Sequence, residues 1–136
     1  MEKEILANLF EQAQKASQNA YCPYSLFPVG AALLTKNQKV FTGCNVENRS
    51  FGLTNCAERT AIFKAISEGE TEIIALAICA PKADYPVSPC GACRQVISEF
   101  SQEDCPIIFG STWENSIQTT IKELFPFDAL KELAKN

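Results

Sequence analysis

The sequence predicts an α/β fold, a three-layer α/β/α sandwich around a mixed five-stranded sheet. Segments with helical spacing of apolar residues alternate along the chain with short apolar runs typical of strands. The first two runs adjoin each other, as in an antiparallel hairpin, whereas helical segments separate most of the later ones and favour parallel pairing in the middle of the sheet. The length of 136 residues and the hydrophobic content of 46% fit one domain spanning 1–136.

In the first third of the chain, each element follows from a local pattern. Apolar side chains at helical spacing over 2–18 predict an amphipathic helix. Apolar runs over 29–34 and 39–44 predict two strands, with a hairpin turn at 37–38. The polar stretch 45–55 is then expected to be a long loop, and loops of this kind are often functional.

The remaining elements alternate more regularly. Residues 57–68 show helical spacing again, with Gly69 as the stop signal. The nearly continuous apolar run 73–80 predicts a central strand buried on both faces. Weaker patterns complete the sheet and its cover, and they predict a helix over 90–100, strands over 106–109 and 116–120, and a closing helix over 128–135.

The chain is acidic, with 12 Lys and Arg residues against 16 Asp and Glu and a formal net charge of -4. A nucleic-acid binder usually carries a basic excess that neutralises phosphates, so we expect a small neutral ligand and no nucleic-acid polymer. No segment approaches the ~20 apolar residues of a membrane span. The start of the chain lacks the apolar core of a signal peptide. These features predict a cytoplasmic protein without a membrane partner.

Seven cysteines and no histidine are the most informative part of the composition. Without histidine, the most common general base and the most common nitrogen ligand of metals are missing. Cytoplasmic cysteines seldom form a disulfide framework, so their number indicates metal or redox chemistry. Four of the seven lie on predicted strands or in loops and are expected to be small buried apolar side chains: Cys22, Cys44, Cys79 and Cys105.

The other three cysteines form a pattern typical of a catalytic zinc site. Cys90 and Cys93 are three residues apart at a predicted helix start, so both thiols can face one point. Cys56 opens another helix, and the amides and dipole of a helix start favour thiolates. Three protein ligands leave the fourth tetrahedral position of Zn²⁺ open, as in catalytic sites. Glu58 can reach that position and carry a proton, although a glutamate at a helix start can also merely complement the dipole.

Three thiolates bring an excess of negative charge to a Zn²⁺ ion and weaken it as a Lewis acid. Arg59 follows Glu58 directly and could donate to a thiolate, which would withdraw some of that charge. Arg94, adjacent to Cys93, is a second candidate. For either arginine the alternative is an ordinary solvated charge on a helix.

Two other interpretations of the cysteines remain open. Cys90 and Cys93 could form a thioredoxin-like redox pair at the start of a helix. Redox chemistry, however, explains neither Cys56 with Glu58 nor the absence of histidine. A zinc-stabilised binding module without enzymatic activity is the second alternative.

The order ligand-x-Glu and then Pro-Cys-x-x-Cys matches the signature of zinc-dependent nucleobase deaminases. With Cys56-Ala57-Glu58-Arg59 as its first half, the chain resembles the small cytidine deaminases, and the similarity runs from about Tyr21 to Phe109. The resemblance implies zinc-dependent hydrolytic deamination of cytidine and 2′-deoxycytidine in pyrimidine salvage. Another cytosine-like nucleoside, such as a nucleoside antibiotic, is the alternative substrate.

The resemblance also implies a role for each residue around the metal. The three cysteines would bind zinc, while Glu58 would activate the water, protonate the ring nitrogen N3 and assist the departure of ammonia. The backbone of Ala57 would contact the carbonyl of the base, and the carbonyl of Ser88 would contact the amino group.

For the rest of the nucleoside, the resemblance implies that Asn45 and Glu47 hold the ribose 3′-hydroxyl and that Phe27 packs against the pyrimidine. Two residues that are two apart on an extended segment point the same way, and an amide with a carboxylate offers both a donor and an acceptor. Without the resemblance, an ordinary polar loop and core packing would be the preferred interpretations of these residues.

The chain departs from the family pattern at two places. Phe51 stands where members commonly have tyrosine. Near the end, the family often has Leu-Leu-Pro and then an aromatic residue that reaches a neighbouring subunit's site, whereas this chain has Leu124-Phe125-Pro126-Phe127. The resemblance nevertheless implies a homotetramer with its sites at subunit contacts.

Overall fold

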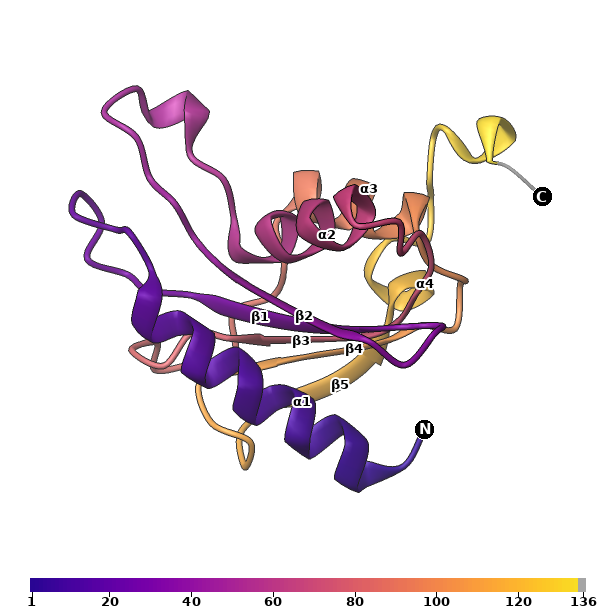
Figure 1. Ribbon diagram of the computed structural model, residues 1–136, viewed down its shortest axis with the longest axis horizontal. Coiled ribbons are helices and arrows are strands. Elements are labelled where there is room, and N and C mark those ends of the chain that lie inside the picture. The colour runs from indigo at the N-terminus through magenta and orange to yellow at the C-terminus, as the bar shows by residue number, and fades with distance from the viewer. Residues whose placement is uncertain (135–136) are drawn as a thin grey trace.

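The computed structural model describes residues 1–134, and its core is a mixed five-stranded sheet between helical layers (Figure 1). The strand order is β2-β1-β3-β4-β5. The strands are β1 (Gly30–Thr35), β2 (Val40–Cys44), β3 (Ile73–Cys79), β4 (Pro106–Gly110) and β5 (Ile117–Thr120). The α-helices are α1 (Lys3–Ala16), α2 (Ala57–Ser67), α3 (Gly91–Glu99) and α4 (Ile121–Leu124). Because α1 covers one face and α2 with α3 the other, the predicted three-layer fold is confirmed.

The topology brings the starts of α2 and α3 to one end of the strands, where β2 and β3 have their carboxyl ends. Strand β1 pairs antiparallel with both β2 and β3, and β3 pairs parallel with β4, so the predicted parallel pairing is confined to one pair. Gly30, at the start of β1, lies opposite Cys44 and Cys79, the last residues of β2 and β3. At this end the chain leaves β2 and, after a loop, enters α2; in the same way it leaves β3 and enters α3. Carboxyl ends of strands are where α/β proteins commonly place a ligand.

The hairpin between β1 and β2 has its turn where the sequence predicts it, with a geometry that usually calls for glycine. Gln38 has a φ of 66°, in the left-handed region that few non-glycine residues adopt. Its N–H donates to the carbonyl of Thr35 at 2.9 Å, and the Thr35 N–H donates to the carbonyl of Lys39 at 2.8 Å. A three-residue loop with a left-handed residue is a common hairpin connection.

Two apolar clusters hold the layers together, one on each face of the sheet. Strand β3 contributes to both because its residues are buried along nearly its whole length, as the sequence predicts for a central strand. Helix α1 buries Leu9 and Phe10 on one face, and α2 buries Ala61 and Ile62 on the other. Burial of a large apolar side chain, such as leucine, isoleucine or phenylalanine, stabilises the fold by about 1.5–3 kcal/mol.

Two glycines let the helices touch the sheet backbone to backbone. A Cβ at Gly43 of β2 would lie 2.5 Å from the amide nitrogen of Ala61 in α2. At Gly30 of β1, a Cβ would collide with the carbonyl oxygen of Ala13 in α1. Both helices are therefore seated as closely as their backbones allow.

The predicted closing helix over 128–135 is wrong. A short α4 over Ile121–Leu124 precedes a loop, and the segment beyond it contains only a 3-10 turn, Lys131–Leu133. Asp128 accepts bonds from the Ser98 hydroxyl at 2.7 Å and from the Leu130 N–H at 2.9 Å, which holds the segment in a turn. Isolated short helices are marginal without an apolar face to bury, and Leu130 and Leu133 are exposed. Residue 135 lies outside the described residues.

Within residues 1–134, the structure contains no helix that is both long enough and apolar enough to cross a membrane.

Candidate metal centre

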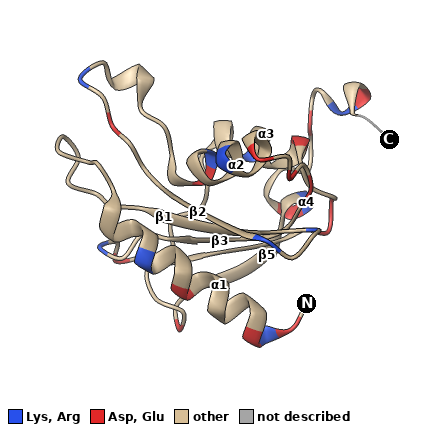
Figure 2. Cartoon of the chain, in the orientation of Figure 1, with Lys and Arg blue, Asp and Glu red and all other residues tan. Residues whose placement is uncertain are grey.

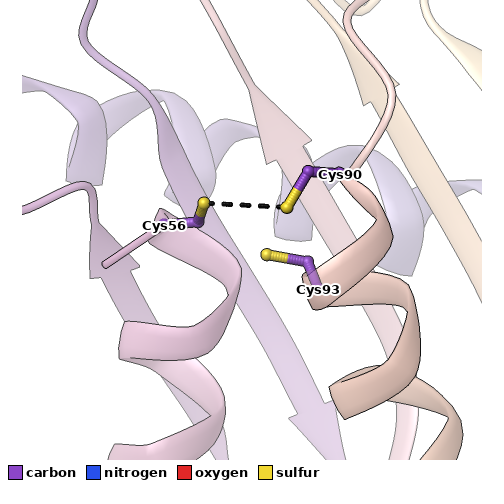
Figure 3. Close-up of side chains that lie close together, drawn as sticks. All are labelled: Cys56, Cys90 and Cys93. Atoms are coloured by element: carbon purple, nitrogen blue, oxygen red, sulfur yellow. Dashed lines mark hydrogen bonds between the residues drawn. The ribbon is translucent and has the colours of Figure 1, made fainter. Parts of the chain in front are cut away.

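Three thiols meet at the edge of the sheet where α2 and α3 begin (Figure 3). Cys56 and Cys90 are the N-cap residues of α2 and α3, and Cys93 lies in the first turn of α3. Their sulfur atoms lie within 4.8 Å of one another, and the Sγ atoms of Cys56 and Cys90 are 3.9 Å apart. The predicted convergence of the three cysteines is what the structure shows.

The spacing of these sulfur atoms fits a zinc ion. With Zn–S distances of about 2.3 Å, tetrahedral geometry requires sulfur atoms about 3.8 Å apart, close to the 3.9 Å between Cys56 and Cys90. Among the residues that the structure describes, this group consists of three possible ligands. A structural zinc site closes with a fourth, so the donor set is that of a catalytic site.

Arg59 donates to one of the three thiols, which is the contact that the predicted charge compensation requires. Its Nη2 donates to the Sγ of Cys56 at 3.3 Å. A hydrogen bond from Cys93, with further help from Arg59, lowers the pKa of the Cys56 thiol to about 5. The pKa of Cys93 is raised because its thiol is hydrogen-bonded to Cys56 and buried. The donation from Arg59 therefore favours the thiolate form of Cys56.

Arg94, the second candidate for this role, donates to two backbone carbonyls and a serine hydroxyl. Its Nε donates to the carbonyl of Pro89 at 2.7 Å, its Nη1 to the carbonyl of Leu124 at 2.7 Å and its Nη2 to the hydroxyl of Ser88 at 3.0 Å. The guanidinium therefore ties the loop before Cys90 to the end of α4. The sequence alone did not reveal these contacts, because carbonyl acceptors belong to every residue.

Glu58 is buried beside the thiols. Its exposed fraction is 4%, although it stands in the first turn of α2. A glutamate that merely complemented the helix dipole would keep its carboxylate in water. Burial is the main reason why the pKa of Glu58 is raised to about 7. A carboxyl group with such a pKa can both take up and release a proton near neutral pH.

A cavity of about 190 Å³ opens in front of Glu58. Its lining brings together residues from the segments before β1 and after β2, from β3, from the starts of both helices and from the loops that precede these helices. Six of the predicted site residues belong to it: Asn45, Cys56, Ala57, Glu58, Ser88 and Cys90.

Asn45 and Glu47 hold the loop that leads into β1. Asn45 accepts from the Val29 N–H at 2.9 Å and donates its Nδ2 to the Phe27 carbonyl at 2.9 Å. The Glu47 carboxylate accepts from the N–H of Tyr24 at 3.0 Å. The hydrogen bond from the Ser25 hydroxyl, together with those from the backbone of Ser25 and Tyr24, keeps the pKa of Glu47 below the usual range. Phe27 and Glu47 lie on the segments adjoining the cavity and are not among the described residues that line it.

A small backbone ladder connects this loop to the segment that carries Cys56. The Tyr21 N–H donates to the carbonyl of Asn45 at 3.0 Å, and the Glu47 N–H donates to the carbonyl of Tyr21 at 2.8 Å. On the other side, Val46 and Asn55 exchange N–H donations at 2.9 and 3.0 Å. Asn45 and Glu47 are therefore fixed relative to Cys56, the residue after Asn55.

The phenylalanine that departs from the family pattern takes part in the same region. Phe51 packs its ring against Tyr24, with centroids 5.6 Å apart and planes tilted by 58°. Figure 1 shows the two loops that carry these rings projecting on the same side of the molecule. Tilted ring pairs at this distance are favourable.

The remaining cysteines stay apart from the metal centre. Cys79 and Cys105 are buried, as the sequence predicts, and burial raises the pKa of their thiols to about 11 and about 12. Cys22 and Cys44 are only half-buried, so for them the expected burial is incomplete.

Comparisons with known proteins agree with this geometry. Residues 3–109 match the model of a family described as the cytidine and deoxycytidylate deaminase zinc-binding region. A cytidine deaminase of Sporosarcina psychrophila is 48% identical over 124 residues, which cover 91% of this chain and 90% of that protein. Another from Halalkalibacterium halodurans is 49% identical over 118 residues, covering 87% and 89%.

Solved structures give the same result. The crystal structure of a cytidine deaminase from Burkholderia pseudomallei superposes with a TM-score of 0.84 at 42% identity, and the match covers 93% of this chain and 98% of that one. The fold and the open three-thiol site define a zinc-binding deaminase domain. The chain belongs to the cytidine and deoxycytidylate deaminase family, and the resemblance seen in the sequence is confirmed.

Proposed function

We propose that this protein hydrolyses cytidine and 2′-deoxycytidine to the corresponding uridine nucleosides and ammonia, in the salvage of pyrimidines. The observation that carries the proposal is the buried Glu58 carboxyl beside the three-thiol cluster, both in the lining of one cavity. The relatives named above are cytidine deaminases, which supports this substrate over a nucleoside antibiotic.

The proton chemistry falls to Glu58. Zinc bound by Cys56, Cys90 and Cys93 would supply a Lewis acid that lowers the pKa of a water molecule. Glu58 would take one proton from that water and pass it to N3 of the cytosine ring, and the water oxygen would bond to C4. The C4–N bond then breaks, and Glu58 carries the second proton to the departing amine, so that ammonia and the uridine product leave.

The cavity and the segments beside it would provide the contacts that orient the nucleoside. Asn45 and Glu47 bind the 3′-hydroxyl of the sugar, and Phe27 packs against the pyrimidine. The backbone of Ala57 meets the carbonyl of the base, and the carbonyl of Ser88 meets the amino group. Asn45, Ala57 and Ser88 all belong to the cavity lining, which supports their assignment.

One assay on one sample tests the proposal. Purified protein is incubated with cytidine while its ultraviolet absorbance band and the release of ammonia are followed, and zinc is measured on the same preparation. We expect about one zinc per chain. Glu58→Ala should keep the metal and lose turnover by about 10²–10⁴-fold. Wild-type turnover in this variant would refute the mechanism.

The alternatives give different results in the same assay. A non-enzymatic zinc module releases no ammonia from any nucleoside and unfolds when a chelator removes the metal. A thiol oxidoreductase that uses Cys90 and Cys93 keeps its activity in Cys56→Ser, whereas the zinc site does not survive that change. Cytidine compared with free cytosine and with nucleoside antibiotics resolves the substrate class.

A cytoplasmic homotetramer without a nucleic-acid partner completes the proposal. Figure 2 shows Lys and Arg dispersed among Asp and Glu over several elements rather than gathered in one stripe. Large apolar side chains near the cavity and on the C-terminal segment are exposed, as expected of surfaces that meet other subunits; among them are Phe51 at 73% and Phe127 at 91%. Light scattering after gel filtration would measure the mass, and a monomer at micromolar concentration would contradict this part.

A further inference from the structure

The loop before β1 is folded around the carboxylate of Glu47. Oε1 of Glu47 accepts from the N–H groups of Tyr24 at 3.0 Å and Ser25 at 3.1 Å, and Oε2 accepts from the Ser25 hydroxyl. The same hydroxyl oxygen accepts from the Phe27 N–H at 3.0 Å. Ser25 is therefore the link between Glu47 and the backbone of Phe27.

We propose that Ser25 is a positioning residue for nucleoside binding, whose hydroxyl fixes the Glu47 carboxylate so that one acceptor position remains for one sugar hydroxyl. This inference rests on the proposed function, which assigns Asn45 and Glu47 to the 3′-hydroxyl. The contacts of Ser25 are with Glu47 and Phe27, so it would act on the substrate through these two residues.

The hydrogen-bonding capacity of the pair is nearly used up. An ionised carboxylate has about four acceptor positions, and the described residues fill both of those on Oε1 and one on Oε2 of Glu47. The amide of Asn45 has two N–H donors, and one of them is held by the Phe27 carbonyl. On the carboxylate one acceptor position remains and on the amide nitrogen one donor, and these suit a single hydroxyl, which donates one hydrogen bond and accepts another. The amide oxygen of Asn45, which accepts from the Val29 N–H, keeps a second lone pair.

The Ser25 hydroxyl decides where the remaining acceptor points. Without it, the carboxylate is held through Oε1 alone, and both positions of Oε2 become available to water. The Phe27 N–H would also lose its partner, which loosens the segment that carries the ring expected against the pyrimidine. Buried or half-buried polar groups that lose a partner weaken binding by leaving unpaired groups behind.

The loop that carries Leu26 is expected to relax when the hydrogen bonds of the Ser25 hydroxyl are removed. Leu26, between Ser25 and Phe27, has a φ of 57°, a left-handed conformation that is unfavourable for a bulky side chain. Its N–H donates to the Cys22 carbonyl at 2.9 Å, which closes the turn. A strained residue persists only where the surrounding contacts hold it, and the Ser25 hydroxyl supplies two of those contacts.

Steady-state kinetics of Ser25→Ala with two substrates test the inference. With cytidine, we expect KM to rise about tenfold while kcat changes less than about twofold, as for the loss of a hydrogen bond to a charged group. With 3′-deoxycytidine, which lacks the hydroxyl, the rise in KM should be clearly smaller, about threefold or less, because only the loosening of the Phe27 segment remains. Ser25→Thr keeps a hydroxyl and should restore the cytidine KM.

A purely structural role for Ser25 predicts a different pattern. Ser25→Ala would then lower activity by the same factor on both nucleosides, and that result overturns the inference, as does an unchanged KM for cytidine. Ser67→Ala is the matched control, since it removes a serine hydroxyl that donates to the Lys64 carbonyl at 2.8 Å, away from Glu47. Should Ser25→Ala fail to fold, Ser25→Cys keeps a weaker donor and should give an intermediate KM for cytidine, with a smaller change for 3′-deoxycytidine. Equal losses on both nucleosides overturn the inference there too.

The wild-type measurements separate this inference from the function on which it rests. Failure to deaminate cytidine refutes the proposed function, and the inference with it. Equal wild-type KM values for cytidine and 3′-deoxycytidine refute the assignment of Asn45 and Glu47, and with it the role of Ser25. Normal wild-type preferences without the selective effect of Ser25→Ala refute the inference alone.

Discussion

At the metal end of the cavity, every candidate ligand stands at the start of a helix packed on the sheet, whereas at the sugar end the candidate residues stand in loops. Cys56 and Cys90 have their positions set by α2 and α3. Asn45 and Glu47 keep theirs through hydrogen bonds between side chains and the backbone. We therefore expect the metal end to depend on a few residues that cannot be replaced, whereas at the sugar end many weaker contacts share the positioning of the side chains.

The largest effect is expected from the loss of a zinc ligand. Cys93→Ala should abolish both zinc binding and turnover, because two thiolates cannot complete a catalytic zinc site. Zinc content per chain and cytidine turnover measure this directly. Cys105→Ala is the matched control, since it also truncates a buried cysteine but should lower only Tm. Retained zinc in Cys93→Ala would show that the metal end tolerates the loss of one thiol.

Replacing Arg59 should weaken zinc binding, whereas replacing Arg94 should lower the stability of the fold. Arg59→Gln removes the donor to the Cys56 sulfur and should reduce zinc affinity or kcat/KM by about 10–100-fold, as the loss of such partners does in other metal sites. Arg94→Gln removes three bonds to Pro89, Leu124 and Ser88 and should lower the free energy of unfolding by about 1.5–3 kcal/mol with zinc retained.

Urea unfolding and metal titration of both arginine variants give the four values needed. A large loss of zinc affinity in Arg94→Gln, or none in Arg59→Gln, would mean that the guanidinium groups do not divide their work in this way. Arg49→Gln, in an exposed loop, is the control for removing a positive charge.

The smallest effect is expected at Leu26, whose side chain is 68% exposed and whose φ is positive. Asparagine tolerates the left-handed region better than other non-glycine residues. Leu26→Asn should therefore leave the free energy of unfolding unchanged or raise it by less than about 1 kcal/mol, and Leu26→Val should lower it by about 1–2 kcal/mol. Equal stabilities in urea would show that the loop relaxes without cost.

The same contrast explains how far the sequence could go. The convergence of the three cysteines was predictable because Cys-x-Glu and Cys-x-x-Cys are local patterns at helix starts, and periodicity alone located the strands. Ser25 reaches Glu47 across 22 residues, and Arg94 binds the Leu124 carbonyl across 30. No local pattern marks such pairs. The closing helix was mispredicted because helical spacing says nothing about whether a surface exists for the helix to pack on.

The close seating of the helices at Gly30 and Gly43 limits how the cavity could be enlarged. Helix α2, which carries Glu58, meets the backbone of β2 at Gly43, and a Cβ there would lie 2.5 Å from a main-chain nitrogen. The helix is already as close to the sheet as it can be, and moving it outward would empty the packed core beneath it. Directed evolution toward bulkier nucleosides should consequently find its useful mutations in the loops around 21–28 and 81–89, and selected libraries should leave both glycines untouched.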